Sequence, residues 1–172
     1  MPAAGYDGGV TFSKSIEAVW DGGMRFRALT GSGHEVHADD GESDAGPRPT
    51  ELVLSGLVMC TAMDIVSILD KKRQAYDRYL VHATAVQRED YPQVFTRIDL
   101  VHEISGPGVT EAAVRRCIQL SATTYCPVSA MLAMGETEIH HGYRIENTGP
   151  EPFTAEGEVI VTGPHWIPPA SA

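Results

Sequence analysis

Two of the three cysteines stand in sequence contexts that could support thiol chemistry. Cys60 lies in an apolar run, residues 52–69, where a free cysteine is either a small core residue or a working thiol. Cys126 directly precedes Pro127, and proline favours the first turn of a helix, so Cys126 is expected at or near the N-cap. Unpaired backbone N–H groups there lower the pKa of a thiol. The alternative is a cysteine that merely precedes a helix.

The remaining candidates for chemistry are weaker. Cys117 shares an apolar stripe with Val114 and Ile118, which predicts core packing. The sequence has no CxxC pattern, and the adjacent His140 and His141 would point to opposite faces of a strand. We therefore expect neither a metal site nor a bound cofactor. Nucleotide-binding and serine-hydrolase motifs (GxxxxGK[ST], GxGxxG, GxSxG) are also absent.

Composition and charge narrow the class of protein. The chain has 172 residues, 42% of them hydrophobic, enough for the core of one domain. Its formal charge is −10, so it lacks the basic surface that nucleic acid or an anionic membrane would attract. Three cysteines are too few for a disulfide scaffold, and the N-terminus resembles no signal peptide. A cytoplasmic protein with a small-molecule substrate is expected.

The elements that must position the cysteines segregate along the chain. Alternation and turn residues predict strands first, then a long helix, a strand pair, two helices and a closing strand. This order favours an α+β fold over a doubly wound sheet. The expected strands are 12–20, 24–29, 34–38, 79–87, 94–104, 137–147 and an edge strand at 158–162, and the shorter helices are 110–122 and one from 126.

The long helix is the most distinctive element. Thr50 is a plausible N-cap and Glu51 favours the first turn, while basic residues at 71–73 suit its end. Its first half is apolar on nearly every side, which predicts enclosure by sheets or by a second subunit. The uncharged stretch 52–63 has 12 residues, too short for a membrane span of about 20. A buried core helix is the better interpretation.

Several segments resemble the OsmC/Ohr family of osmotically inducible and organic hydroperoxide resistance proteins, and the match is nearest to an OsmC-like subgroup. Residues 49–54 and 59–74 resemble its central helix, and 91–98 its middle strand pair. Residues 114–116, 120–121 and 125–130 resemble its second cysteine helix. The similarity covers about residues 10–147. We expect an OsmC-like domain at 1–148 and a Pro-rich tail at 149–172 that could add one edge strand.

The resemblance implies an intertwined homodimer with a site at the subunit interface. It implies a thiol-dependent peroxidase in oxidative-stress defence, in which Cys60 attacks an organic hydroperoxide and becomes a sulfenic acid. Cys126 then forms a disulfide with Cys60. An external dithiol reduces that bond, a role that lipoyl groups can fill in the family. The apolar side chains of Leu57, Met59 and Met63 are the expected substrate pocket.

The sequence also departs from the peroxidases it resembles. They carry a Glu directly after the Pro that opens the helix, where this chain has Thr50, with Glu51 one residue later. They also carry a thiolate-pairing Arg on the first hairpin, and the turn at 21–23 has none. Arg25, Arg27, Glu51 and Thr50 are the possible thiolate-stabilising residues. The alternative function is a non-catalytic protein that binds a small ligand or senses oxidants on the same scaffold.

Overall fold

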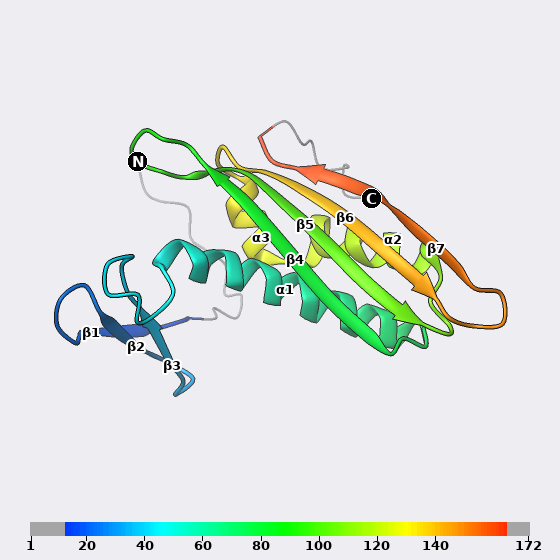
Figure 1. The fold of residues 1–172 in the computed structure, drawn as a ribbon, viewed down its shortest axis with the longest axis horizontal. Coiled ribbons are helices and arrows are strands. Elements are labelled where there is room, and N and C mark those ends of the chain that lie inside the picture. The colour runs from blue at the N-terminus through cyan, green and yellow to red at the C-terminus, as the bar shows by residue number, and fades with distance from the viewer. Residues whose placement is uncertain (1–12, 165–172) are drawn as a thin grey trace, which may run out of the picture. The chain divides into compact units, whose positions relative to one another are not determined.

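The computed structural model describes residues 13–164, which form two compact units, one ending at Leu52 and the other beginning at Val53 (Figure 1). Strands and helices are segregated, so the predicted α+β class is confirmed. In chain order the elements are β1 Ile16–Trp20, β2 Phe26–Thr30, β3 Glu35–Ala38, α1 Pro49–Lys71, β4 Arg78–Gln87, β5 Phe95–Gly106, α2 Glu111–Leu120, the π-helix η1 Ser121–Tyr125, α3 Pro127–Ala133, β6 Glu138–Asn147 and β7 Phe153–Thr162.

The N-terminal unit contains a three-stranded antiparallel sheet in the order β1-β2-β3. Gly22 and Gly23 have positive φ values of 92° and 59°, so glycine is required to turn the chain between β1 and β2. Because side chains alternate along a strand, one face of the sheet carries most of its apolar residues. Three large members of that face are exposed: Ile16 (71%), Trp20 (64%) and Phe26 (43%).

The second unit is built on a four-stranded sheet in the order β4-β5-β6-β7. The β5–β6 pair is parallel and the other pairs are antiparallel, because α2, η1 and α3 form a crossover between β5 and β6 (Figure 1). Helices cover one face of this sheet. The strand expected at 158–162 is the edge strand β7, which begins at Phe153 and pairs with β6.

The observed range of the α1 helix is almost the same as the range predicted for the long helix. It buries one stripe, Leu57, Thr61, Ile65 and Leu69, spaced four residues apart so that they share a face. By length and composition alone α1 could cross a membrane (mean hydropathy 2.2), but this stripe packs into the protein core. Enclosure on all sides is not seen within this chain, because Met59 and Met63 are 55% and 71% exposed.

The start of α1 differs from the prediction by one or two residues. The helix begins at Pro49, so Thr50 lies within its first turn and the N-cap prediction for Thr50 is wrong. Glu51 instead accepts a hydrogen bond from the backbone N–H of Arg48 (2.8 Å). This contact satisfies one of the N–H groups that a helix start leaves unpaired.

The core of the second unit consists of two hydrophobic clusters with polar side chains between them. One cluster includes Ile65, Leu69 and Ile118, and the other includes Leu57 and Cys126. His102 on β5 and His141 on β6 are fully buried on the helix-covered side, at strand positions between those that supply the two clusters. The Nδ1 atom of His102 forms a hydrogen bond with the hydroxyl of Tyr79 (2.8 Å). The Nε2 atom of His141 forms a hydrogen bond with the hydroxyl of Thr162 (3.3 Å).

Candidate functional site: two free thiols beside a buried polar network

Local backbone geometry fixes the position of Cys126. It follows the π-helix η1, and its backbone N–H donates to the carbonyl of Ser121 (3.0 Å). It is the N-cap of α3, where its Sγ accepts a hydrogen bond from the backbone N–H of Ser129 (3.3 Å). The prediction of an N-cap at Cys126 is confirmed. Pi-helical turns are rare and frequently occur at functional sites.

The pKa of Cys126 shifts in the direction opposite to the prediction. Its pKa is raised to about 12, chiefly because burial removes water from the thiolate form. The N–H groups of Ser129 and Val128 lower the pKa by a smaller amount, and Cys60 raises it further. The predicted fall in the pKa is therefore wrong, because desolvation outweighs the helix N-terminus. Cys126 keeps its proton at neutral pH.

Cys60 lies next to Cys126 in the folded chain. It occupies the middle of α1, is partly exposed, and packs against the hydrophobic cluster that contains Cys126. The neighbouring Cys60 thiol is among the groups that raise the pKa of the Cys126 thiol. Both cysteines are free thiols in this structure. The fold thus brings together two sulfur atoms that are remote in the sequence, one partly exposed and one buried.

A buried polar network holds the segments that carry the two thiols. Ser121 in η1 donates a hydrogen bond to Asp64 (2.8 Å), and its hydroxyl also bonds Thr61 (3.0 Å). Thr61 directly follows Cys60, and Asp64 lies one helical turn after it. Sequence reasoning missed the positioning role of these residues. The available clue was Asp64, a charged residue inside an otherwise apolar helix.

Three of the four residues expected to stabilise a thiolate have other partners in the structure. Arg27 forms ion pairs with Asp21 (3.3 Å) and Glu35 (3.2 Å), which raise its pKa. Arg25 donates to the backbone carbonyl of Asp21 (3.4 Å). Glu51 caps α1, as described above, and Thr50 lies beside it in the first turn. A role for any of them toward Cys60 stays a prediction.

The three residues expected to form the substrate pocket separate into two groups. Leu57 is fully buried in the same cluster as Cys126. Met59 and Met63 are exposed on α1. Within this chain the three side chains therefore do not share one pocket, and Leu57 is a core residue.

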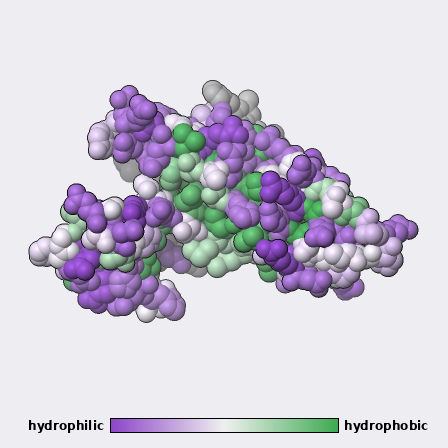
Figure 2. Space-filling model, viewed as in Figure 1, coloured by the Kyte–Doolittle hydropathy of each residue, from purple (hydrophilic) through white to green (hydrophobic). Residues whose placement is uncertain are grey.

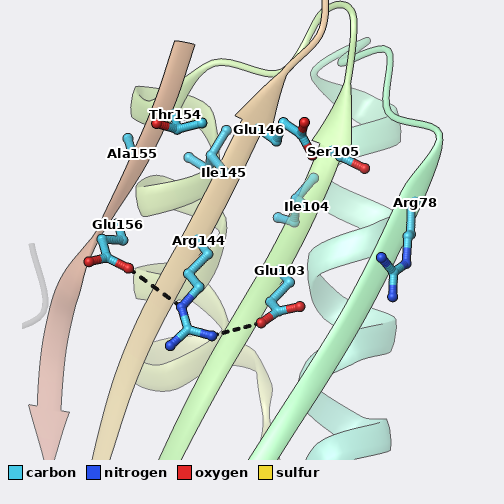
Figure 3. A pocket seen from close by; sticks show the side chains of 10 residues that line it. All are labelled: Arg78, Glu103, Ile104, Ser105, Arg144, Ile145, Glu146, Thr154, Ala155 and Glu156. Atoms are coloured by element: carbon cyan, nitrogen blue, oxygen red, sulfur yellow. Dashed lines mark hydrogen bonds and ion pairs between the residues drawn. The ribbon is translucent and has the colours of Figure 1, made fainter.

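Two pockets in the second unit differ in chemistry. A pocket of about 450 Å³ lies on the open face of the sheet, where Arg144 bridges Glu103 (2.9 Å) and Glu156 (3.5 Å) (Figure 3). No cysteine lines it. A second pocket, of about 530 Å³, is lined by Cys126 and by residues of η1, α3 and the end of β7.

The third cysteine and the potential metal ligands are the remaining candidates for chemistry. Cys117 is fully buried in the core, and burial raises its pKa to about 11, as expected of an inert core thiol. Among residues 13–164, no three His, Cys, Asp or Glu side chains are grouped so that they could hold a metal ion.

Comparison with known proteins places this chain in a family. Residues 40–141 match the family model described as OsmC-like protein. Protein YhfA of Escherichia coli K12 is 38% identical over 126 residues, which cover 73% of this chain and 93% of YhfA. An OsmC-like protein from Mycoplasma pneumoniae superposes with a TM-score of 0.69 at 18% identity, covering 79% of this chain and 99% of that one. An organic hydroperoxide resistance protein OsmC from Legionella pneumophila gives 0.54 at 14% identity, covering 80% and 98%. The chain therefore belongs to the OsmC-like family.

Proposed function

We propose that the protein is a thiol-dependent peroxidase that reduces organic hydroperoxides to alcohols and serves in oxidative-stress defence. The observation that carries the proposal is that two free thiols of unequal exposure, Cys60 and Cys126, lie beside one another in the same hydrophobic cluster. Membership of the OsmC-like family and the fold shared with proteins named for organic hydroperoxide resistance support it.

The proposed reaction uses each sulfur once. The Cys60 thiolate attacks the outer oxygen of the hydroperoxide, the O–O bond breaks, and the alkoxide takes a proton and leaves as the alcohol. Cys60 is now a sulfenic acid. The sulfur of Cys126 attacks that of Cys60, and the departing hydroxide combines with the Cys126 proton to form water. The product is a Cys60–Cys126 disulfide, which an external dithiol must reduce.

The roles of the two cysteines follow from their surroundings. Cys60 is partly exposed, so an oxidant can reach it, whereas Cys126 is only 3% exposed. Cys126 retains its proton because burial and Cys60 both raise its pKa. A protonated Cys126 can donate a hydrogen bond to a Cys60 thiolate, which supplies some of the stabilisation that an arginine would otherwise give.

The direct test is to map the products of one turnover. Reduced protein is treated with one equivalent of cumene hydroperoxide, the remaining thiols are alkylated, and peptides are identified by mass spectrometry. We expect a Cys60–Cys126 disulfide and an alkylated Cys117. Recovery of all three cysteines as free thiols would overturn the proposal and favour the ligand-binding alternative.

We also propose that the chain works as a homodimer. On α1, Val53, Met59 and Met63 are 44%, 55% and 71% exposed, and apolar side chains gather over α1 and β4 (Figure 2). The N-terminal sheet also exposes an apolar face, which includes Trp20. Soluble monomers rarely leave apolar patches of more than a few hundred Å² open. A second copy of the chain is the proposed cover, and Met59 and Met63 then become available to line a substrate site.

A charge placed on the exposed side of α1 tests the dimer. We expect Met63→Glu to shift the molar mass measured by light scattering from the dimer toward the monomer, because a carboxylate at a buried interface loses its hydration. The matched control is Ala112→Glu, at an exposed position of α2 outside the apolar face of α1. A wild-type protein that is monomeric at micromolar concentration would contradict the proposal.

A further inference from the structure

The pocket beside Cys126 is formed partly by the C-terminal part of the chain. Its walls come from η1, from the first and last turns of α3, and from residues 162–164 at the end of β7 and just beyond it. The last of these lie beyond the segment that matches the family model, which ends at residue 141. The C-terminal part of this chain thus helps to build a cavity of about 530 Å³ with Cys126 in its wall. Cys60 does not line it.

Among residues 13–164, the lining of this pocket carries no charged side chain. It consists of alanines, hydroxyl side chains, prolines, Met134 and Tyr125 around the Cys126 thiol. Tyr125 and Met134 are 54% and 87% exposed, so they stand where the pocket meets solvent. A site with these walls suits a small uncharged molecule, because an ion entering it would lose hydration without gaining a partner. The chain's charge of −10 adds a general repulsion of anions.

We propose that this pocket admits an uncharged thiol reductant, which attacks the Cys126 sulfur of the Cys60–Cys126 disulfide. This inference rests on the proposed function, since it concerns the step that restores the reduced protein. Oxidant and reductant then approach different sulfur atoms by different routes.

The chemistry of thiol–disulfide exchange also favours attack at the sulfur of Cys126 over attack at that of Cys60. The reductant enters as a neutral thiol. Its sulfur gives up the proton to water as it bonds to the Cys126 sulfur, the S–S bond breaks, and Cys60 leaves as a thiolate. Attack at Cys60 would instead expel the Cys126 thiolate, which is a poor leaving group because its pKa is about 12. A second thiol of the reductant then gives up its proton and attacks the mixed disulfide on the reductant's sulfur. Cys126 departs, takes a proton, and the reductant is released as its own disulfide.

The point of attack can be trapped with a monothiol. The disulfide is formed with diamide, so that the test does not depend on peroxide chemistry. It is then exposed briefly to 2-mercaptoethanol, quenched with acid, alkylated, and mapped by mass spectrometry. We expect the mercaptoethanol adduct on Cys126 and the alkyl group on Cys60. The reverse distribution would overturn the inference and leave the proposed peroxidase function intact.

Two matched comparisons test the pocket itself. Ala130 lines the pocket and is exposed, so Ala130→Leu narrows the pocket without disturbing the core. We expect it to slow reduction by dithiothreitol about tenfold while the rate of Cys60 oxidation by hydroperoxide stays unchanged. Ala112→Leu, at an exposed position of α2 away from the pocket, is the control. Equal reduction rates in the two variants would refute a route through the pocket.

The charge of the reductant provides the second comparison. 2-Mercaptoethanol and 2-mercaptoethanesulfonate have similar sizes, but the second carries a sulfonate. After correction for the pKa of each thiol, we expect the neutral thiol to react about tenfold faster with the wild-type disulfide. Equal rates would show that no uncharged pocket selects the reductant. Failure of hydroperoxide to form the disulfide that diamide forms would instead count against the proposed function.

Discussion

Replacing Cys60 by serine is expected to lower the rate of hydroperoxide consumption by about three orders of magnitude or more. A serine hydroxyl stays protonated at neutral pH and cannot attack the peroxide oxygen as a thiolate does. The measurement is the loss of cumene hydroperoxide with dithiothreitol as the reductant. The change is small in volume and Cys60 is only partly buried, so the variant is expected to fold.

The companion variants separate the roles of the three thiols. Cys126→Ser should consume about one equivalent of hydroperoxide and then slow, because Cys60 remains a sulfenic acid that a dione probe can label. Cys117→Ala should turn over like the wild type, since Cys117 is buried in the other core cluster. Wild-type rates from Cys60→Ser would show that Cys60 is not the attacking thiol.

The buried histidines should make the second unit markedly less stable in mild acid. Burial, with a smaller contribution from a neighbouring histidine, lowers the pKa of His102 to about 3 and that of His141 to about 4; the neighbours are His141 and His140 respectively. In the unfolded chain both residues titrate near an ordinary pKa of about 6.5. Both are therefore neutral in the fold, and each leaves one ring nitrogen without a hydrogen-bond partner among the described residues.

The sign of the pH effect follows from proton uptake. Below about pH 6.5 the unfolded chain binds protons at these two positions and the folded chain does not, so acid favours unfolding. Each histidine contributes up to about 1.4 kcal/mol per pH unit as the pH falls toward its folded pKa. The stability is fully present above pH 6.5 and is lost progressively below it. A loss of several kcal/mol is a large part of the 5–15 kcal/mol typical of a domain.

Urea unfolding between pH 7.5 and 5 at one protein concentration measures this slope. Asp99 and Glu103 stay ionised across this range, because their pKa values lie below ordinary ones. His102→Asn preserves an acceptor for the Tyr79 hydroxyl and should reduce the slope by about half. His34→Gln, at an exposed position, should leave it unchanged. A free energy of unfolding that is flat from pH 7.5 to 5 would contradict the prediction.

Local patterns in the sequence were sufficient for the elements that carry the thiols. The long apolar run with basic residues at its end predicts α1, and the Cys126–Pro127 pair predicts the N-cap of α3; both are observed. The helix expected at 110–122 is also observed as α2, Glu111–Leu120, with Thr110 as its N-cap. These features depend on residues within a few positions of one another, which is the range over which capping and side-chain periodicity act.

Features that depend on the whole chain could not be inferred in this way. The pKa of Cys126 depends on how much of the fold surrounds it, and burial reversed the effect predicted from its N-cap position. The Thr61–Ser121–Asp64 network joins residues of α1 and η1, and the pocket joins η1 and α3 to the end of β7.

The sequence by itself determined the α+β class, the long helix and the two cysteines to consider, because residue types and short-range periodicity encode these features. Only the tertiary structure decided which sulfur is buried, which side chains hold the two cysteine segments together, and where a cavity opens beside Cys126. The reason is that desolvation and contact depend on neighbours supplied by distant segments, and these neighbours exist only once α1, η1 and the sheet have packed.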